Sequence, residues 1–299
     1  MAKLIQCVPN FSEGCDQNVI NKLANTASKI PGVTLVDYSS DESHNRSVFT
    51  LVGSPDGIFE AAFELCKTAS ENIDMTKHKG EHPRMGATDV IPLIPVKDCS
   101  AEECVEICKN LAKRINDELK IPIFLYEDAC SSEGRRNLAK IRKGQFEGMS
   151  QKLLEDDWAP DYGERKIHPT AGVTAVGVRF PLIAFNVNLG TSDVEIANKI
   201  AKIVRGSSGG FKHCKGIGIM LEDRNIAQVS MNMVNYQETP LYRVFETIKM
   251  EADRWGVPVI GSEVIGLTPA KALVDCAEYY LKIEDFNYDK QVLENSLLG

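Results

Sequence analysis

The feature that most constrains the fold is that the chain runs through one order of elements twice. Alternating and periodic apolar positions predict a strand, a helix, two strands, a helix and a strand in each half. In the first half the predicted strands cover residues 4–8, 33–37, 47–52 and 90–96, and the helices cover 18–30 and 57–72. In the second half the strands cover 182–187, 216–221, 226–234 and 257–260, and the helices cover 193–204 and 241–255. Each half is therefore interpreted as a β-α-β-β-α-β unit.

The duplication predicts an α/β fold of the α+β type with two similar sandwich subdomains, 1–180 and 181–299. Local details repeat as well, because Asn45 precedes a predicted strand much as Asn225 does. Helices on one face of each sheet would leave the other face free to meet its twin, and we expect a ligand cleft between the two. The glycine-rich stretch 134–179 connects the halves, and a connection of that length is usually functional or a linker.

Composition excludes several classes of protein. The 299 residues are 43% hydrophobic and 25% charged, as in a globular protein with a core, which excludes collagen and disordered chains. The net charge of -8 argues against a nucleic-acid partner. The nine cysteines are an odd number scattered along the chain, typical of reduced thiols, and no apolar run is long enough to cross a membrane. We therefore expect a cytoplasmic protein with neither nucleic-acid nor membrane partners.

The most concentrated polar segment is 77–87, which holds two of the five histidines. His78 to His82 spells H-x-x-E-H, a zinc-protease motif that needs both histidines one turn apart on a helix. Gly80 and Pro83 disfavour that helix, so no metal is expected here, and a zinc hydrolase is kept as a rival hypothesis. A loop histidine flanked by Lys, Arg and Glu is better suited to proton transfer, because imidazole titrates near pH ~6.5. The alternative is a solvated polar loop.

Two further segments are candidates for binding. Residues 163–172 offer a glycine at each end, adjacent cations and a histidine. Glycines let backbone N–H groups approach a flat or anionic ligand, although an interdomain linker is the alternative interpretation. Residues 205–215 form a basic glycine-containing stretch that lacks the Walker A pattern, so a surface loop is the default interpretation there.

Several motifs resemble the formiminotransferase family, and the similarity runs essentially from end to end. They are Cys7-Val8-Pro9-Asn10-Phe11-Ser12-Glu13-Gly14, Asn45-Arg46, residues 77–87, Trp158-Ala159-Pro160-Asp161, Ala184-Phe185-Asn186-Val187-Asn188 and Ala227-Gln228-Val229-Ser230. The block H-K-G-E-H-P-R-M-G-A that begins at His78 is far more specific than a short motif.

The resemblance implies transfer of the formimidoyl group from N-formimidoyl-L-glutamate to N5 of tetrahydrofolate, with release of L-glutamate, in histidine degradation and one-carbon metabolism. It implies that His82 is the catalytic acid/base and that tetrahydrofolate is a co-substrate, with no metal. The folate is expected to contact Gly163, Glu164, Arg165, Lys166, Ile167, His168, Pro169, Thr170, Ala171 and Gly172. Animal relatives carry a fused cyclodeaminase, so this chain is expected to be a stand-alone form, and a homodimer by resemblance.

Both expected ligands are polycarboxylates, so cations must line the cleft of this acidic protein. We expect them among Arg46, Lys79, Arg84 and Lys212, beside Arg165 and Lys166 of the folate segment. The carboxylate partner of His82 stays open, with Asp41 as one candidate. Two other functions stay open as well: formyl transfer between glutamate and tetrahydrofolate at the same site, and a folate carrier without turnover.

Overall fold

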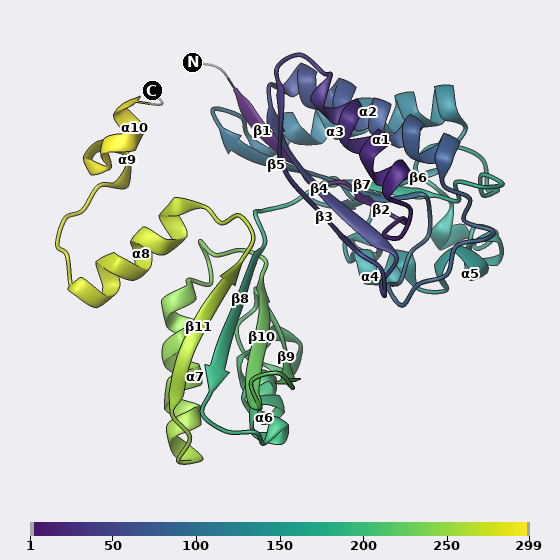
Figure 1. Ribbon diagram of the computed structural model, residues 1–299. Helices are drawn as coiled ribbons and strands as arrows, with labels where there is room; N and C mark the ends of the chain where they lie inside the picture. The colour runs from purple at the N-terminus through teal and green to yellow at the C-terminus, as the bar shows by residue number, and fades with distance from the viewer. Residues whose placement is uncertain (1–2, 298–299) are drawn as a thin grey trace. The chain divides into compact units, whose positions relative to one another are not determined.

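A computed structural model describes residues 3–297 (Figure 1). The chain divides into two compact units, residues 1–179 and residues 180–299. Each unit has its own sheet and its own hydrophobic core. None of the helices in the described part of the chain has the length and apolar character needed to cross a lipid bilayer.

The first unit contains the predicted β-α-β-β-α-β order. Its strands are β1 (Leu4–Cys7) with its short continuation β2 (Asn10–Phe11), β3 (Val33–Asp41), β4 (Arg46–Gly53) and β5 (Thr88–Lys97). The helices between them are α1 (Gln17–Ser28) and α2 (Pro55–Asn72). Strand β1 pairs antiparallel with both β4 and β5, and β3 pairs antiparallel with β4. The spatial order is therefore β3-β4-β1-β5.

The helices begin where side chains cap them. Asp16 accepts a hydrogen bond from Asn18 N (2.8 Å) at the start of α1, and Ser100 forms a reciprocal capping box with Glu103 at the start of α3 (Ala101–Leu119). Each helix turns its apolar stripe toward one face of the sheet, where α1, α2 and α3 lie side by side (Figure 1).

The first unit extends beyond this order through a pair of parallel strands. Strand β6 (Ile123–Glu127) pairs with β7 (Thr174–Val178), and β7 pairs with β5, so that the last strand of the unit lies between two earlier ones. All five residues of β7 are buried. Of the two alternatives for 134–179, functional or a linker, the linker is therefore wrong, because this segment supplies a buried strand between β5 and β6.

The rest of that segment covers the second face of the extended sheet. Alternate residues of β5, β6 and β7 contact α1–α3 on one face and a smaller core on the other, so these parallel strands are buried on both faces. The smaller core lies against α4 (Leu138–Arg142) and α5 (Gln145–Lys152), with 3-10 turns at Glu133–Arg135 and Asp156–Trp158. Its main members are Met85, Val90, Phe124, Tyr126, Ile141, Met149 and Leu153.

One buried lysine holds this cover in place. The Lys152 ammonium donates to the carbonyl oxygens of Lys140 (2.5 Å), Ile141 (2.7 Å) and Lys143 (3.1 Å) at the end of α4. It also lies 3.9 Å from the centre of the Trp158 ring. Burial lowers the pKa of Lys152 to about 8.

The second unit has the same topology without the added parallel strands. Its strands are β8 (Ile183–Leu189), β9 (Cys214–Leu221), β10 (Ile226–Met233) and β11 (Val259–Ile265), in the antiparallel order β11-β8-β10-β9. Helices α6 (Val194–Val204) and α7 (Leu241–Arg254) pack on one face, with a 3-10 turn at Gly206–Ser208. The chain continues through α8 (Ala270–Leu281), α9 (Tyr288–Gln291) and α10 (Leu293–Leu297). The predicted fold class, two similar α+β subdomains, is confirmed.

The second face of this sheet carries a row of polar side chains. Gln228 donates to Asn188 (2.7 Å), and Asn188 donates to Glu263 (3.0 Å). Arg224 also donates to Glu263 (3.1 Å). These four polar side chains thus bond to one another within the second unit.

Candidate active site

The histidine-rich segment forms an irregular loop between α2 and β5. No helix forms over residues 77–87, so His78 and His82 do not share a helix face as the zinc-protease motif requires. Within residues 3–297, no group of three His, Cys, Asp or Glu side chains is arranged to hold a metal ion.

The tip of the β3–β4 hairpin fixes this loop. Asn45 adopts a positive φ of 46°, its side-chain oxygen accepts from Gly14 N (2.8 Å), and its amide donates to Lys79 O (2.8 Å). The hairpin backbone lies so close to the loop that a Cβ on Gly80 would come within 2.4 Å of the His44 carbonyl oxygen. Gly80 is therefore needed for close backbone packing.

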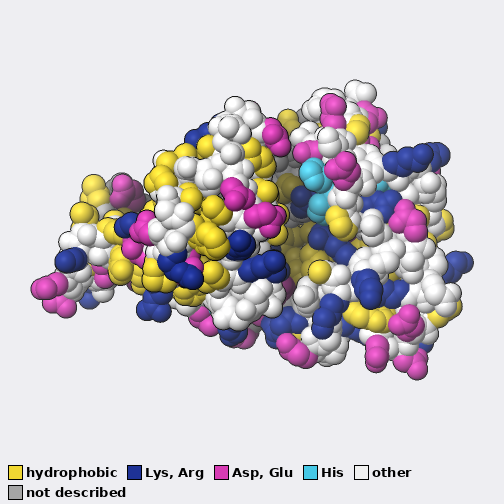
Figure 2. Space-filling model, turned by 90° about the horizontal axis from the view of Figure 1, so that it is seen from below, with side chains coloured by type: hydrophobic (Ala, Val, Ile, Leu, Met, Phe, Trp, Pro, Cys, Tyr) yellow, Lys and Arg dark blue, Asp and Glu magenta, His cyan; other side chains and the backbone are white. Residues whose placement is uncertain are grey.

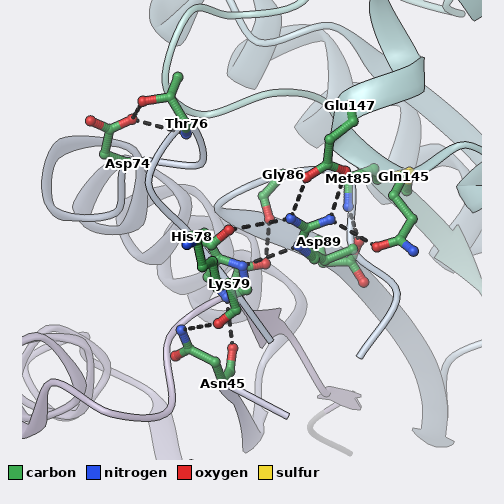
Figure 3. Close-up of polar contacts among 12 residues, drawn as sticks. Asn45, Asp74, Thr76, His78, Lys79, Met85, Gly86, Asp89, Gln145 and Glu147 are labelled. Carbon is green, nitrogen blue, oxygen red and sulfur yellow. Dashed lines mark hydrogen bonds and ion pairs between the residues drawn. The ribbon is translucent and has the colours of Figure 1, made fainter. Parts of the chain in front are cut away.

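Arg84 ties the loop to the segment that covers the sheet. It is 6% exposed, and its guanidinium donates to Gln145 (2.8 Å) and to both oxygens of Glu147 (2.6 and 2.9 Å) (Figure 3). Its remaining N–H groups donate to His78 Nδ1 (3.1 Å) and, at 3.4 Å, to the His78 carbonyl. Every N–H of Arg84 is therefore bonded within the protein, which leaves none for a substrate carboxylate in this arrangement.

His78 is held as one neutral tautomer by these contacts. Its Nδ1 accepts from Arg84, so that nitrogen carries no proton, and its Nε2 lies 2.9 Å from the Asn45 carbonyl oxygen, to which it donates. Both ring nitrogens are thus occupied. The contacts of His78 indicate a residue that braces the loop and does not exchange protons with a ligand.

His82 lies in a different environment. It is half-buried, and its Nδ1 is buried without a hydrogen-bond partner among the described residues. Its ring is 6.3 Å from that of His44 in an edge-on arrangement. Burial, with the positive charges of Arg46 and Arg142, lowers the pKa of His82 to about 4. The imidazole is therefore neutral at pH 7 and has a nitrogen free to accept a proton.

Two arginines and one buried carboxylate lie around this histidine. Arg142, from α4, donates to the carboxylate of Asp89, which is 2% exposed. Arg46, from the start of β4, donates to the Asn10 side chain. Burial and the charge of Arg142 lower the pKa of Arg46. The guanidinium groups of Arg46 and Arg142 therefore act on each other and on His82.

Asp41, one candidate partner of His82, is bonded elsewhere. Its carboxylate accepts from the His44 backbone N (2.8 Å) and lies 3.0 Å from His44 Nδ1. The hydrogen bond from the His44 backbone lowers the pKa of Asp41. Asp41 thus orients His44 on the hairpin tip.

These residues line a tight pocket, too narrow for a water molecule in this structure, beside an open groove. The pocket is lined by Phe11, Ser12, His44, Asn45, Arg46, His78, His82, Arg84 and Asp89. The groove, ≈ 470 Å³, is lined by Thr76, Lys77, His78, Lys79, Gly80, Arg84, Gln145 and Glu147. On the face shown in Figure 2, histidine side chains reach the surface with Lys and Arg side chains beside them. Predicted site residues His82, Arg46 and Arg84 thus line one pocket, and Lys79 lines the adjoining groove.

The predicted folate segment 163–172 meets this site at one end only. Ala87 N donates to Ala171 O (3.0 Å), and Gly172 bridges to Gly86 at the end of the histidine loop. A Cβ on Gly172 would come within 2.3 Å of Met85 O, so this glycine is required for close chain packing.

The other end of the segment is exposed and lies against α3. Gly163 has a φ of +103°, and a Cβ there would come within 2.4 Å of the Asn116 side chain. Arg165 pairs with Asp156 (2.8 Å). The two glycines therefore have backbone roles, and a contact of this segment with folate stays a prediction.

Lys212, the fourth predicted cation, belongs to the second unit. Its ammonium lies 3.6 Å from Glu238, which also accepts from His213 (3.0 Å). The predicted default for residues 205–215, a surface loop, agrees with an exposed Lys212.

Sequence reasoning missed Arg142, Asp89 and His44 as members of the site. Asp89 gave a usable signal, because a carboxylate inside a strand of apolar residues needs a charged partner. Arg142 gave none, since it lies in the stretch that was interpreted as a linker. Only the packing of α4 on the sheet brings it to Asp89.

Comparison with known proteins decides the family. The formiminotransferase domain, N-terminal subdomain, matches residues 4–179, and the formiminotransferase domain matches residues 184–295. The chain belongs to the formiminotransferase family. A glutamate formimidoyltransferase of Streptococcus pyogenes serotype M1 is 72% identical over 299 residues, and the match covers 100% of both chains. One from Thermoplasma acidophilum is 42% identical over 98% of this chain and 97% of its own.

Fused relatives match over part of their length. The formimidoyltransferase-cyclodeaminase of Gallus gallus is 44% identical over 95% of this chain but only 53% of its own length. The bacterial relative, in contrast, is matched over its full length. As a member of this formiminotransferase family, the chain is a transferase.

Proposed function

We propose that the pocket around His82 transfers a formimidoyl group from N-formimidoyl-L-glutamate to N5 of tetrahydrofolate and releases L-glutamate. The family membership supports the reaction, and the state of His82 supports its place in it. The observation that carries the assignment is the buried, unpartnered Nδ1 of a half-buried imidazole that is neutral at pH 7. A neutral imidazole has one unprotonated nitrogen, which can accept a proton from a reactant that reaches it.

The reaction requires two proton transfers that one imidazole can perform in turn. N5 attacks the formimidoyl carbon, forming the C–N5 bond and a tetrahedral intermediate in which N5 carries an extra proton. Neutral His82 accepts that proton. The imidazolium then donates it to the glutamate nitrogen as the bond between that nitrogen and the formimidoyl carbon breaks.

Imidazole suits both transfers. N5 becomes strongly acidic once it has attacked, so a weak base is sufficient to deprotonate it. The imidazolium is a stronger acid than an alkylammonium, so protonated His82 can donate to the leaving nitrogen. His44, held by Asp41, and His78, held by Arg84, orient the walls of the pocket in this scheme.

Other parts of the assignment are proposals that rest on the family. We place the folate against residues 163–172, with Lys79 and Lys212 as cations for its carboxylates. Arg84 has a positioning role in this scheme, because its N–H groups are already bonded. A homodimer in the cytoplasm, working without a metal, completes the proposal.

The test is release of L-glutamate from N-formimidoyl-L-glutamate by metal-free protein, with and without tetrahydrofolate. The proposal expects release only when the folate is present. Release without folate would identify a hydrolase and reject the transfer. Folate binding without release would reject it in favour of formyl transfer or a carrier, which N-formyl-L-glutamate as donor would then distinguish.

A further inference from the structure

The pocket around His82 holds more positive than negative charge. Asp89 is the one carboxylate among its lining residues, and Arg142 already donates to it. Arg46 has a neutral partner, the side-chain oxygen of Asn10. Arg84, the other arginine of the lining, is paired with Glu147. Burying an uncompensated charge is costly, so the excess positive charge favours an anionic ligand.

Unused hydrogen-bond donors lie at the same place. The Nε atoms of Arg46 and Arg142 are buried, and neither has a hydrogen-bond partner among the described residues. A guanidinium Nε–H can only donate, so each of these groups requires an acceptor. Buried polar groups without partners are uncommon in folded proteins, and here two of them belong to cations that interact with His82. A carboxylate both accepts hydrogen bonds and carries negative charge, so it is a suitable partner for the two groups.

We propose that Arg46 and Arg142 bind the α-carboxylate of the formimidoyl donor and thereby place its leaving nitrogen beside His82. This inference rests on the proposed function. In N-formimidoyl-L-glutamate the leaving nitrogen and the α-carboxylate are attached to the same carbon atom. A carboxylate held at these arginines therefore brings that nitrogen within reach of the imidazole. In tetrahydrofolate the carboxylates are separated from N5 by the aminobenzoyl group, so the same anchor would carry N5 away from His82.

Binding at this site changes the electrostatics of His82. Arg46 and Arg142 both contribute to the low pKa of the imidazole in the empty pocket. A bound carboxylate offsets their charges, so the pKa of His82 rises when the donor is present. The histidine is then better able to hold the proton that it takes from N5. The donor itself would therefore adjust the residue that acts on it.

Kinetics of three arginine variants test the anchor. Arg46→Gln removes the excess charge and keeps an amide that can donate to Asn10, and we expect KM for N-formimidoyl-L-glutamate to rise about 10- to 100-fold. Arg142→Lys keeps the charge beside Asp89 but removes the Nε donor, so the rise should be smaller. Arg136→Gln is the control, because Arg136 is a partly exposed residue that pairs with Asp128 and Glu133. KM for tetrahydrofolate should stay within about 2-fold in all three.

A rise in KM for tetrahydrofolate alone would assign the site to the folate tail and overturn the proposal. Unchanged KM values for both substrates in folded Arg46→Gln would overturn it as well.

A binding measurement needs no turnover and so separates this inference from the proposed function. The pH titration of the His82 ring is measured by NMR in the presence of L-glutamate, L-glutamine or L-isoglutamine. L-Glutamine keeps the α-carboxylate, and L-isoglutamine keeps only the side-chain carboxylate. We expect L-glutamate and L-glutamine to raise the pH midpoint of His82 and L-isoglutamine to leave it unchanged. A response to L-isoglutamine but not to L-glutamine, or no response to any of the three, would overturn the proposal. A wild-type protein that binds L-glutamate in this way but never releases it from the donor would contradict the proposed function alone.

Discussion

The two units build hairpins of the same length and place different chemistry on them. The β3–β4 turn runs from Asp41 to Arg46 and the β9–β10 turn from Leu221 to Ile226, each with an asparagine of positive φ. In the first unit Asn45 bonds to the histidine loop. In the second unit the residue before the asparagine, Arg224, pairs with Glu263 of its own sheet. One topology thus supports the pocket around His82 in one copy and a row of mutually bonded polar side chains in the other.

The difference arises from elements that the first unit adds to the shared core. Between α2 and β5 the first unit has the histidine loop, and after β5 it adds α3, β6, α4, α5 and β7. These additions bring Arg142 and Glu147 to the pocket. The second unit has neither a comparable loop nor parallel strands in its described residues. The pocket around His82 depends on elements added to the repeat, because the histidine loop and α4 supply side chains for which the repeat has no counterpart.

The largest expected difference between the units is in catalysis. His82→Ala should lower kcat by about 10²- to 10⁴-fold, the usual contribution of a general acid/base, while tetrahydrofolate still binds. The matched change in the second unit, His213→Ala, removes a histidine that pairs with Glu238 and should leave kcat within about 3-fold. Steady-state kinetics with folate binding by fluorescence provides the comparison. Equal losses in the two variants would remove the functional distinction between the units.

The next difference concerns stability. Each unit has one tryptophan with a lysine over its ring: Lys152 lies 3.9 Å from the ring centre of Trp158, and Lys199 lies 4.4 Å from that of Trp255. Lys152→Met leaves three carbonyl oxygens without their donor and should lower the free energy of unfolding by about 1–3 kcal/mol. Lys199→Met should cost less than about 1 kcal/mol. Urea denaturation measures both losses of stability. Similar losses in the two variants would mean that the hydrogen bonds of Lys152 to the carbonyl oxygens contribute little.

The two hairpin asparagines sharpen the comparison further. Asn45→Ala and Asn225→Ala both place alanine at a positive φ, which costs about 1–2 kcal/mol. Only Asn45→Ala also breaks the bonds to Gly14 and Lys79, so we expect kcat/KM to fall about 10-fold in that variant alone. Kinetics and urea midpoints should be measured on both. Loss of activity in Asn225→Ala would show that the second hairpin also serves the reaction.

The smallest expected effect is a pH dependence that belongs to the first unit. Because the pKa of His82 is lowered to about 4 from 6.5, the unfolded chain takes up a proton before the folded protein does as the pH falls. The contribution of His82 to the free energy of unfolding is therefore complete above pH 6.5 and is lost as the pH falls from 6.5 to about 4. For this half-exposed group we expect about 1 kcal/mol between pH 7 and pH 5 after solvent screening. Urea midpoints of the wild type and of His82→Asn at pH 7 and pH 5 measure this contribution. An equal loss of stability in the two proteins would contradict the lowered pKa of His82.

Most helices were predictable because their start signals are local. The amphipathic stripes predict α1, α2, α6 and α7 within two residues of their observed bounds, whereas α4 and α5 of the stretch 134–179 were not predicted. Strand β7 was missed although Thr174–Val178 is an apolar, β-branched stretch, because it comes after a glycine-rich region without strand partners nearby in sequence. Non-local pairing, which single-sequence patterns do not contain, decided its place.

The site was predictable where its residues share one segment. The histidine loop could be singled out from composition alone, but the difference between His78 and His82 could not. The difference is that Arg84 and Asn45 bond to the two ring nitrogens of His78, whereas Nδ1 of His82 has no partner among the described residues. The charges that surround His82 come from β4, β5 and α4, which only the tertiary structure brings together.

The central place of β7 also has a consequence for synthesis on the ribosome. Strand β6 pairs with β7 in the described structure, yet β7 is the last strand of its unit to be made, roughly 50 residues later. At about 5–20 residues per second, β6 and the outer edge of β5 wait for several seconds without their partner. An unpaired strand edge is a template for association with other chains. The nascent first unit is therefore most in need of chaperone protection in the interval before residue 178 leaves the exit tunnel.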